Sequence, residues 1–435
     1  MNPIGSHRAN NPGFACNYLD RYSSGLDWEL PKPDPDLFLS VVIPSFKEPE
    51  IIISLDSLLS CDPPGISWEI LIVINYPAGS SPEVVEISRK TCEQIRSSQQ
   101  DLHRSDVSVH FLWCPDLPVK RAGVGLARKI GMDEAVRRFN TIGRSEGLIA
   151  SFDADSTCDP GYLKEIASFF ATSRARAANI YFEHSLEGSF KPENYQAIAE
   201  YELYLRYFRL AVERTGHPHA IHTVGSSFCL RASTYVRVNG MGSHQAGEDF
   251  YFLHKCVQQG RFYEINTTTV YPSSRESDRV IFGTGATVRK QAGSEGMLKV
   301  YSLDTFAWLT GLYARLETLY RQMDAGSGLF DYSSGMPEEV GSFKKKTRLE
   351  EKMIELYRVT SSYPAFRKRF FSWFDVLMIL RYLNELHPGV YPKSPVMGEA
   401  SALARIAGIP VGATCREMLM NYREFEKSRG IRRVT

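Results

Sequence analysis

Two aspartates separated by one residue, Asp153 and Asp155, follow an apolar run that ends at Phe152. Side chains at positions i and i+2 of an extended chain point the same way, so both carboxylates face one small volume. A hard divalent cation such as Mg²⁺ or Mn²⁺ takes one or two carboxylates and completes its coordination with substrate phosphate oxygens. The spacing therefore indicates a metal-diphosphate site. The alternative, equally favoured when the motif is taken alone, is that Asp153 and Asp159 only cap turns, where Asp is common.

A second acidic pair, Glu248-Asp249, opens the segment EDFYFLHKCVQQ, whose apolar spacing predicts a helix. A carboxylate in this position can act as the general base that deprotonates an acceptor hydroxyl. The alternative is favourable charge at a helix N-terminus, which contributes about 1 kcal/mol or less. Taken alone, this pair favours the alternative.

Basic residues in two segments are candidates for phosphate contacts. KRAGVGLARKIG (residues 120–131) brings glycines and Arg128 to a predicted helix start, where phosphate binds readily. Its spacing matches neither the dinucleotide fingerprint nor a GxxxxGK[ST] phosphate loop. Arg275 and Arg279, in a polar Gly-rich loop, can clamp a diphosphate by bidentate contacts. For both arginines the alternative is ordinary surface charge.

Polar residues also follow the first two predicted strands. Lys47 and Glu48 come after the first strand, and Asn75 comes after the second. Each of these side chains is placed to contact a base or a ribose, and each also fits an ordinary loop.

Histidines and cysteines give little sign of a transition-metal site. His217, His219 and His222 alternate as metal-binding histidines can, but a polar loop is favoured here. The eight cysteines are scattered, with no CxxC pair. We therefore expect neither a disulfide framework nor structural zinc, but reduced thiols and a cytoplasmic location.

The elements that must position these residues alternate between strand and helix. Apolar runs rich in β-branched residues are typical of strands buried on both faces. Such alternation predicts an α/β fold with a mostly parallel sheet and helices on both faces, in which ligands bind at the carboxyl ends of the strands. The predicted strands of this part are residues 37–44, 68–74, 107–113, 147–152 and 178–182.

The chain divides into three predicted parts. Residues 1–36 are polar, end in PKPDPD, and are expected to be an irregular extension. Residues 37–290 form the sheet domain. Residues 291–435 show helical spacing and loops only. A length of 435 residues fits a main domain with an appendage.

Bulk properties narrow the function classes. The net charge is +1, with no long basic run, so a nucleic-acid partner is not expected. The N-terminus lacks the apolar core of a signal peptide. The apolar stretch 370–383 contains Asp375 and Arg381 and is too short to span a bilayer, so a buried or interface helix is favoured over a helix on a membrane surface.

Four motifs in order resemble the family 2 glycosyltransferases with a GT-A fold. VVIPSFKEPEIIISLDSLL is similar to their opening strand and loop, and ARKIG to their ARNxG helix. Asp153-Ala154-Asp155 matches the DxD signature, and Glu248-Asp249 matches the later ED signature. The resemblance covers roughly residues 37–272.

The resemblance implies a role for each matching residue. Asp155 and Asp153 would hold Mn²⁺ or Mg²⁺, and Asp153 would also contact the ribose or sugar. Asp249 would be the base of an inverting displacement, and Glu248 would orient Asp249 or bind the acceptor. Arg128 would support the phosphate-side loop. The remaining expected donor-binding residues are Pro44, Phe46, Glu48, Asn75, Ala154, Arg275 and Arg279.

The implied activity is metal-dependent transfer of a hexose from a nucleotide-sugar, with a UDP-sugar favoured, to a hydroxyl acceptor. Two departures from the family pattern concern recognition of the donor's nucleobase. Lys47 stands where the family has Asn, and NYPAGSS replaces DDGS after the second strand. The alternatives are a retaining transferase of the sugar-phosphoglycerate type and a nucleotide-sugar-binding scaffold without turnover. Peripheral membrane contact and a homodimer are further partners that the sequence leaves open.

Overall fold

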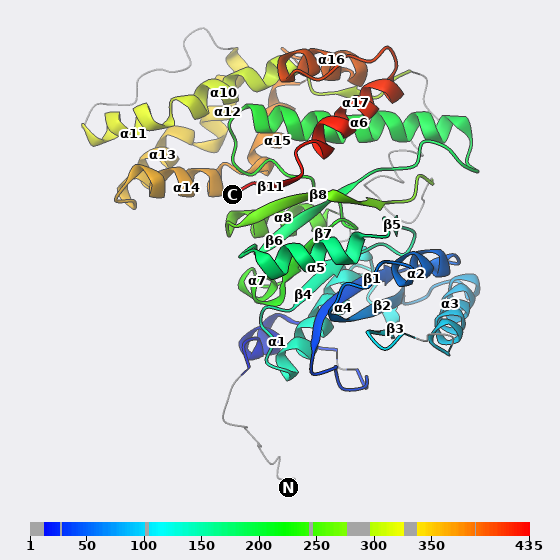
Figure 1. The fold of residues 1–435 in the computed structure, drawn as a ribbon. Coiled ribbons are helices and arrows are strands. Elements are labelled where there is room, and N and C mark those ends of the chain that lie inside the picture. Colours follow the sequence, from blue (N-terminus) through cyan, green and yellow to red (C-terminus); the bar gives the residue numbers. More distant parts are fainter. Residues whose placement is uncertain are drawn as a thin grey trace. The chain divides into compact units, whose positions relative to one another are not determined.

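The computed structural model describes residues 13–26, 28–100, 104–242, 247–275, 296–325, 337–387 and 389–435 (Figure 1). The chain forms two compact units. The first contains Met1–Phe182 and Thr223–Ser273, and the second contains Glu183–His222 and Ser274–Thr435. Residues 183–222 thus leave the first unit and group with the C-terminal helices, although they lie between its strands in the sequence.

A mostly parallel sheet forms the centre of the first unit. Within this unit the strand order is β8-β6-β7-β4-β1-β2-β3. Strand β7 runs antiparallel to both of its neighbours, and β5 pairs antiparallel with β8. The strands are β1 (Leu37–Ser45), β2 (Ser67–Pro77), β3 (Val107–Leu117), β4 (Leu148–Ser151), β5 (Thr157–Cys158), β6 (Ala177–Phe182), β7 (Phe228–Arg231) and β8 (Phe262–Tyr271).

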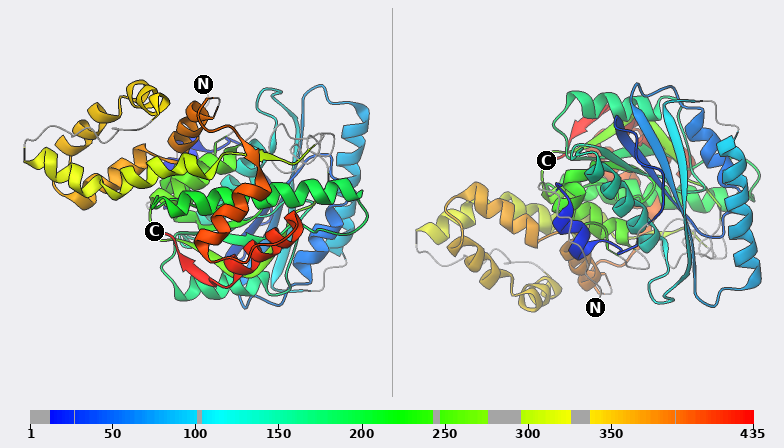
Figure 2. Two further views of the ribbon diagram at one scale, coloured as in Figure 1. Left: turned by 90° about the horizontal axis from the view of Figure 1, so that it is seen from above. Right: turned by 90° about the horizontal axis from the view of Figure 1, so that it is seen from below.

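Helices cover both faces of this sheet, which explains why its strands are apolar without alternation. The helices are α2 (Ile51–Leu59), α3 (Pro82–Gln100), α4 (Val124–Thr141), α5 (Tyr162–Thr172), α7 (Ala232–Arg237) and α8 (Glu248–Gln258). Val41 of β1 belongs to a core cluster that includes residues of α2, α3 and α5. Its neighbour Val42 points the other way, to Gly131 of α4. Figure 2 gives two further views of the ribbon, in which the sheet and its flanking helices can be followed. An added Cβ at Gly131 would lie 2.5 Å from Val42 Cγ1, so only glycine allows α4 to pack this closely.

The N-terminal extension contains a helix, α1 (Cys16–Tyr22), where the sequence predicts irregular chain. Its Tyr18 hydroxyl donates a 2.6 Å hydrogen bond to Asp133, a fully buried residue of α4. Tyr235 and Lys129 also donate to this carboxylate. These bonds satisfy a buried charge that would otherwise be costly, and they fasten the extension to α4.

The second unit is mainly helical. Its long helix α6 (Pro192–Arg214) packs against α16 (Val396–Ala407) and α17 (Cys415–Lys427). Short strands occur where the sequence predicts only helices and loops: β9 (Lys299–Val300), β10 (Ser394–Pro395) and β11 (Ile431–Arg433). The remaining elements are η1 (Leu303–Phe306), α10 (Ala307–Ala314), α11 (Leu316–Asp324), α12 (Glu338–Thr347), α13 (Leu349–Arg358), α14 (Tyr363–Trp373) and α15 (Val376–Leu386).

The apolar stretch 370–383 spans parts of two helices, because the chain breaks between α14 and α15. Asp375 is the N-cap of α15, and its side chain accepts a hydrogen bond from Met378 N. Phe370 and Phe374 are buried and stack with ring centroids 5.5 Å apart. No helix in the described part of the chain is long and apolar enough to cross a membrane.

The predicted α/β class is confirmed. A mostly parallel sheet with helices on both faces occurs together with a C-terminal helical region. The carboxyl ends of β1, β2 and β4 lie at one edge of the sheet, because these strands are parallel neighbours. Three of the predicted site segments follow or end these strands.

Candidate active site

Arg128 is the centre of the candidate site. It lies in the first turns of α4, and its side chain is only 5% exposed. Its Nη2 is 2.6 Å from Asp153 Oδ1, and its Nη1 forms an ion pair with Glu248 Oε1. One guanidinium therefore joins the DxD segment to the later acidic pair. The sequence predicted all three residues as site residues, but not their mutual contacts.

The neighbouring carboxylates keep the buried Arg128 guanidinium protonated. Burial alone would lower the pKa of the guanidinium, but Asp153, Glu248 and Asp249 outweigh this effect and raise the pKa above its ordinary value. Arg128 is therefore a fixed cation, and it compensates part of the charge of a strongly acidic site.

Gly225 makes room for this guanidinium. A Cβ atom at position 225 would lie 2.4 to 2.5 Å from three atoms of the Arg128 guanidinium. Sequence reasoning missed Gly225. The one available signal was its place in the small-residue run Gly225-Ser226-Ser227 directly before β7, and such a run also fits an ordinary strand start.

The Asp153-Ala154-Asp155 segment forms a turn just beyond β4. Phe152 N still donates to Val42 O at 3.0 Å, which continues the pairing with β1. The chain then turns, and Ser156 N donates to Asp153 O at 3.1 Å. Ala154 is buried while Asp153 and Asp155 are half-buried. The two carboxylates thus flank an inward-facing methyl group at the carboxyl end of the sheet.

Glu248 and Asp249 begin α8, and their environments differ. Gly247 before them has φ of +72°, a left-handed conformation suited to glycine. Glu248 is 2% exposed and bound to Arg128. Asp249 is half-buried, and its Oδ1 accepts a 2.7 Å hydrogen bond from Phe250 N. Glu248 is therefore held in place by Arg128, whereas Asp249 is bound through its carboxylate to its own helix start and is partly exposed as a residue.

The pKa of Asp249 is raised to about 7. Burial is the main cause, and the negative charges of Glu248 and Asp153 add to it. Arg128 and the Phe250 N–H act in the opposite direction. A carboxylate with a pKa near neutrality is suited to accept a proton in catalysis.

The predicted nucleoside side lies at the ends of β1 and β2. Pro44 is buried within β1, and Phe46 follows β1 half-buried. Glu48 is 2% exposed, and its carboxylate accepts a hydrogen bond from Glu50 N. Its environment thus supports the start of α2 as well as the predicted contact with the donor.

Asn75 lies inside a strand, because β2 continues to Pro77; its predicted place in a loop after the strand is wrong. The strand extends because its pairing with β3 also continues, to Pro77 opposite Leu117. Asn75 is 2% exposed, and its Oδ1 has no hydrogen-bond partner among the described residues. A buried carbonyl oxygen without a donor is costly, so this atom is a candidate to receive one from a ligand.

Lys47 has φ of +50°, the left-handed region that Asn adopts more readily than Lys. Its Nζ is 3.8 Å from a Glu83 carboxylate oxygen. The backbone at this position thus has the conformation that favours the Asn of the resembling family, although the side chain differs.

The structure does not test the predicted arginine clamp. Arg275 belongs to the second unit and is half-buried. Arg279 lies outside the described residues. The contacts of both arginines with a diphosphate therefore stay a prediction.

The carboxylates near the site fit a metal ion that binds together with the substrate. No group of three His, Cys, Asp or Glu side chains able to hold a metal occurs in the described ranges. Mg²⁺ bound with a nucleotide needs only one or two carboxylates, because phosphates and water complete its shell. Asp155 and Asp153 supply this number, although one oxygen of Asp153 is paired with Arg128.

The three clustered histidines bind other protein groups. His217 Nε2 is 2.9 Å from Phe374 O, and His222 Nε2 is 3.1 Å from Glu426 Oε1. Burial lowers the pKa of His219 to about 4. These contacts agree with the structural interpretation that the sequence favoured.

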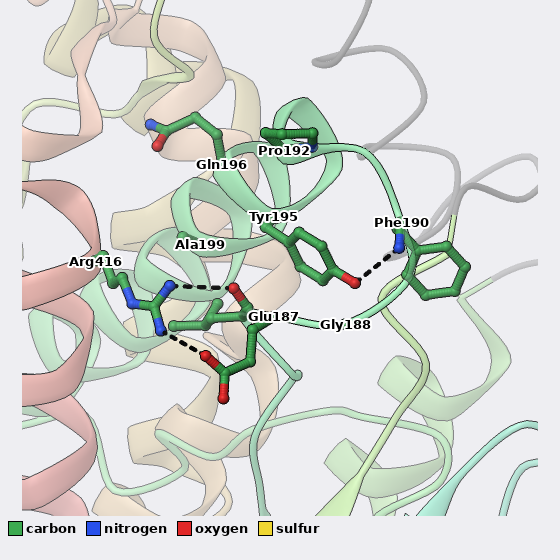
Figure 3. A pocket seen from close by; sticks show the side chains of 9 residues that line it. Glu187, Gly188, Phe190, Pro192, Tyr195, Gln196, Ala199 and Arg416 are labelled. Carbon is green, nitrogen blue, oxygen red and sulfur yellow. Dashed lines mark hydrogen bonds and ion pairs between the residues drawn. The ribbon is translucent and has the colours of Figure 1, made fainter.

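A separate hollow of about 390 Å³ lies within the second unit (Figure 3). The rings of Phe190 and Tyr195 line it, together with the guanidinium of Arg416. Arg416 Nη1 donates to Leu186 O, and Phe190 N donates to the Tyr195 hydroxyl at 2.9 Å. Much of the polar lining of this hollow thus forms hydrogen bonds with other residues that line it.

Comparisons with known proteins give matches of fold only. No protein-family model and no curated protein sequence matches the chain. Residues 1–349 of S. aureus TarS in complex with UDP-GlcNAc match at 14% identity and a TM-score of 0.38, over 90% of this chain and 91% of that one. GalNAc-T7 with UDP, GalNAc and Mn²⁺ matches at 13% identity and a TM-score of 0.34, over 55% of this chain and 44% of that one. TM-scores this low carry no argument about substrate, metal or mechanism.

Proposed function

We propose that the protein is a glycosyltransferase that moves a sugar from a nucleotide-sugar to a hydroxyl acceptor, with inversion at the anomeric carbon. The observation that carries the proposal is the ion pairing of one buried arginine, Arg128, with both Asp153 and Glu248. This pairing gathers two acidic pairs from distant parts of the sequence. One pair is suited to a metal diphosphate, and the other ends in a carboxylate whose pKa is near 7.

In this proposal the acceptor hydroxyl attacks the anomeric carbon while the bond to the diphosphate oxygen breaks. Asp249 takes the hydroxyl proton, a contribution of about 10² to 10⁴ in rate for a positioned base. Glu248 acts as a positioning residue, because its carboxylate is bound to Arg128 and it precedes Asp249 on α8. Asp155 and Asp153 would hold Mn²⁺ or Mg²⁺, which would supply positive charge beside the departing diphosphate.

The nucleoside would lie against Pro44, Phe46, Glu48 and Asn75. The buried Asn75 Oδ1 would accept a hydrogen bond from the base or the ribose, which would satisfy that atom. Arg275 and Arg279 would contact the diphosphate. A UDP-sugar is the preferred donor class, so UDP and UDP-GlcNAc are the first ligands to test.

Donor binding tests the proposal directly. Calorimetry with UDP and UDP-GlcNAc should show affinity that requires Mn²⁺ or Mg²⁺ and falls about tenfold or more in Asp155→Asn, because the cation loses a charged ligand. Asp36→Asn is a matched control, since Asp36 is 91% exposed. Equal, metal-independent affinity in all three proteins would reject the metal-diphosphate site.

Measurements on the same proteins also test the two alternative functions. The anomeric configuration of the product, read by NMR, separates inversion from a retaining transferase of the sugar-phosphoglycerate type. The departures at Lys47 and Asn75 favour the other alternative, a scaffold that binds nucleotide-sugars without turnover. Metal-dependent binding without donor hydrolysis or transfer to any acceptor tested would favour that scaffold.

A further inference from the structure

Cys61 and Cys158 are 97 positions apart in the sequence, but their sulfur atoms are 3.6 Å apart. Cys61 follows α2 and is 3% exposed, while Cys158 lies in β5 and is half-buried. Both cysteines are free thiols in this structure. A disulfide requires a separation of about 2.05 Å, so side-chain rotation has only a short distance to close.

Two hydrogen bonds join the segments that carry this pair, one accepted by a side chain and one by a backbone carbonyl. Cys158 N donates to Ser57 Oγ at 2.9 Å. Asp62 N donates to Pro160 O at 2.8 Å. The segments that carry the two thiols are thus already joined just before Cys61 and just after Cys158. A bond between the sulfur atoms does not require the segments to approach from a distance.

The pair also has the acid–base properties of a reactive dithiol. The hydrogen bond between the Cys61 and Cys158 sulfur atoms is the main cause that lowers the pKa of Cys61 below its ordinary value, and Arg104 contributes to the effect. Burial raises the pKa of the solitary cysteines Cys92 and Cys415, each to about 11. Since the thiolate is the reactive form, Cys61 is favoured over these two as a nucleophile.

We propose that Cys61 and Cys158 are a redox-modification site at which hydroperoxides form an intramolecular disulfide. The Cys61 thiolate attacks one oxygen of hydrogen peroxide, the O–O bond breaks, and Cys61 sulfenic acid and hydroxide result. The Cys158 sulfur then attacks Cys61 Sγ and displaces the second hydroxide. This hydroxide takes the Cys158 thiol proton, while the first hydroxide takes from the buffer the proton that Cys61 released on ionising. Two thiols lose two electrons, and one peroxide becomes two waters.

Peptide mapping tests the site without reference to glycosyl transfer. The folded protein is treated with hydrogen peroxide, its remaining thiols are alkylated, and its peptides are analysed by mass spectrometry. We expect one cross-linked peptide pair containing Cys61 and Cys158, lighter by two hydrogens and released by a dithiol reductant. Cys16→Ser, which removes a half-buried solitary thiol, should give the wild-type yield of this pair.

The single variants Cys61→Ser and Cys158→Ser should both lose the cross-link. The oxidised wild-type protein should melt at a higher temperature than the reduced protein, because a long cross-linked span restricts the unfolded chain. Alkylation of both thiols after peroxide, or oxidation of Cys61 to sulfinic acid without a cross-link in the wild type, would overturn the proposal. A lower melting temperature would also overturn it, because the favourable backbone geometry would then be wrong.

Discussion

Arg128 and Glu248, 120 positions apart in the sequence, form an ion pair that is almost fully buried. The guanidinium is 5% exposed and the carboxylate 2% exposed, and the same guanidinium also binds Asp153. Breaking such a pair on one side leaves a charge without compensation in a poorly hydrated place. This relationship links the stability of the first unit to its candidate chemistry.

Replacing Arg128 by methionine should destabilise the protein by about 3–5 kcal/mol, because Glu248 stays buried without its partner. The double variant Arg128→Met/Glu248→Gln should recover part of this loss, since glutamine carries no charge. Urea unfolding of the wild type, both single variants and the double variant measures the coupling. Additive effects of the two substitutions would contradict the role of Arg128 as the partner of Glu248.

Gly225→Ala should cost about 1–3 kcal/mol, the usual range for overpacking, and should weaken donor binding. The added Cβ would meet the Arg128 guanidinium at 2.4 to 2.5 Å and displace it from Asp153 and Glu248. Gly341→Ala is the matched control: Gly341 lies within α12 in open space, so alanine should stabilise that helix by up to about 1 kcal/mol. Wild-type stability and donor affinity in Gly225→Ala would contradict the claim that close packing of Gly225 against Arg128 holds the guanidinium in place.

Asp249→Asn should be more stable than the wild type at pH 8, and this advantage should shrink toward pH 4. The folded-state pKa of Asp249 is about 7, raised from an unfolded value of about 3.9. The wild type is therefore penalised by ionisation of Asp249 as the pH rises through this window, whereas asparagine does not ionise. Unfolding in urea at several pH values measures the difference. The same difference at pH 4 and pH 8 would mean that Asp249 has an ordinary pKa.

Glu213 in the second unit should show the opposite pH dependence. Burial raises the pKa of its carboxyl, but bonds to Arg429 and the charges of Arg209 and Arg432 outweigh burial and hold the pKa at about 2. The ionised Glu213 stabilises the folded protein at pH values above the pKa of glutamate in the unfolded chain, about 4.3. This stabilisation is lost as the pH falls toward 2. The free energy of unfolding of Glu213→Gln, measured in urea, should therefore be about 2–3 kcal/mol below that of the wild type at pH 7 and almost equal to it near pH 2.

Glu86→Gln is the control for that experiment. Glu86 is 51% exposed and, among the described residues, its ion pairs are with two neighbours on its own helix, Arg89 and Lys90. Its removal should cost less than about 1 kcal/mol at any pH. Equal losses in the two variants at pH 7 would show that the arginines around Glu213 do not stabilise the fold.

The first unit was predictable from sequence because its strands are apolar on both faces and its helices begin at recognisable residues. Apolar runs such as 68–74 locate buried strands regardless of what they pair with. The association of residues 183–222 with the C-terminal helices was not predictable, because the helical periodicity of α6 does not say which unit it packs against. The α1 helix escaped prediction since Tyr18, its buried residue, is anchored by the distant Asp133.

The candidate site was predictable as residue types but not as geometry. Carboxylate spacing indicated Asp153 and Asp155, whereas the contact of Arg128 with Glu248 depends on tertiary packing. The requirement for Gly225 follows only from the position of that guanidinium. The raised pKa of Asp249 is likewise a property of its surroundings, which no local pattern encodes.

The rate of donor turnover as a function of pH tests the central claim most directly. With UDP-GlcNAc and Mn²⁺, either hydrolysis of the donor or transfer from it should rise with an apparent pKa near 7, the value for Asp249. Asp249→Asn should lower kcat by about 10² to 10⁴ and abolish that rise, while donor affinity stays close to wild type. An undiminished rate with the same pH profile in Asp249→Asn would contradict the assignment of Asp249 as the catalytic base.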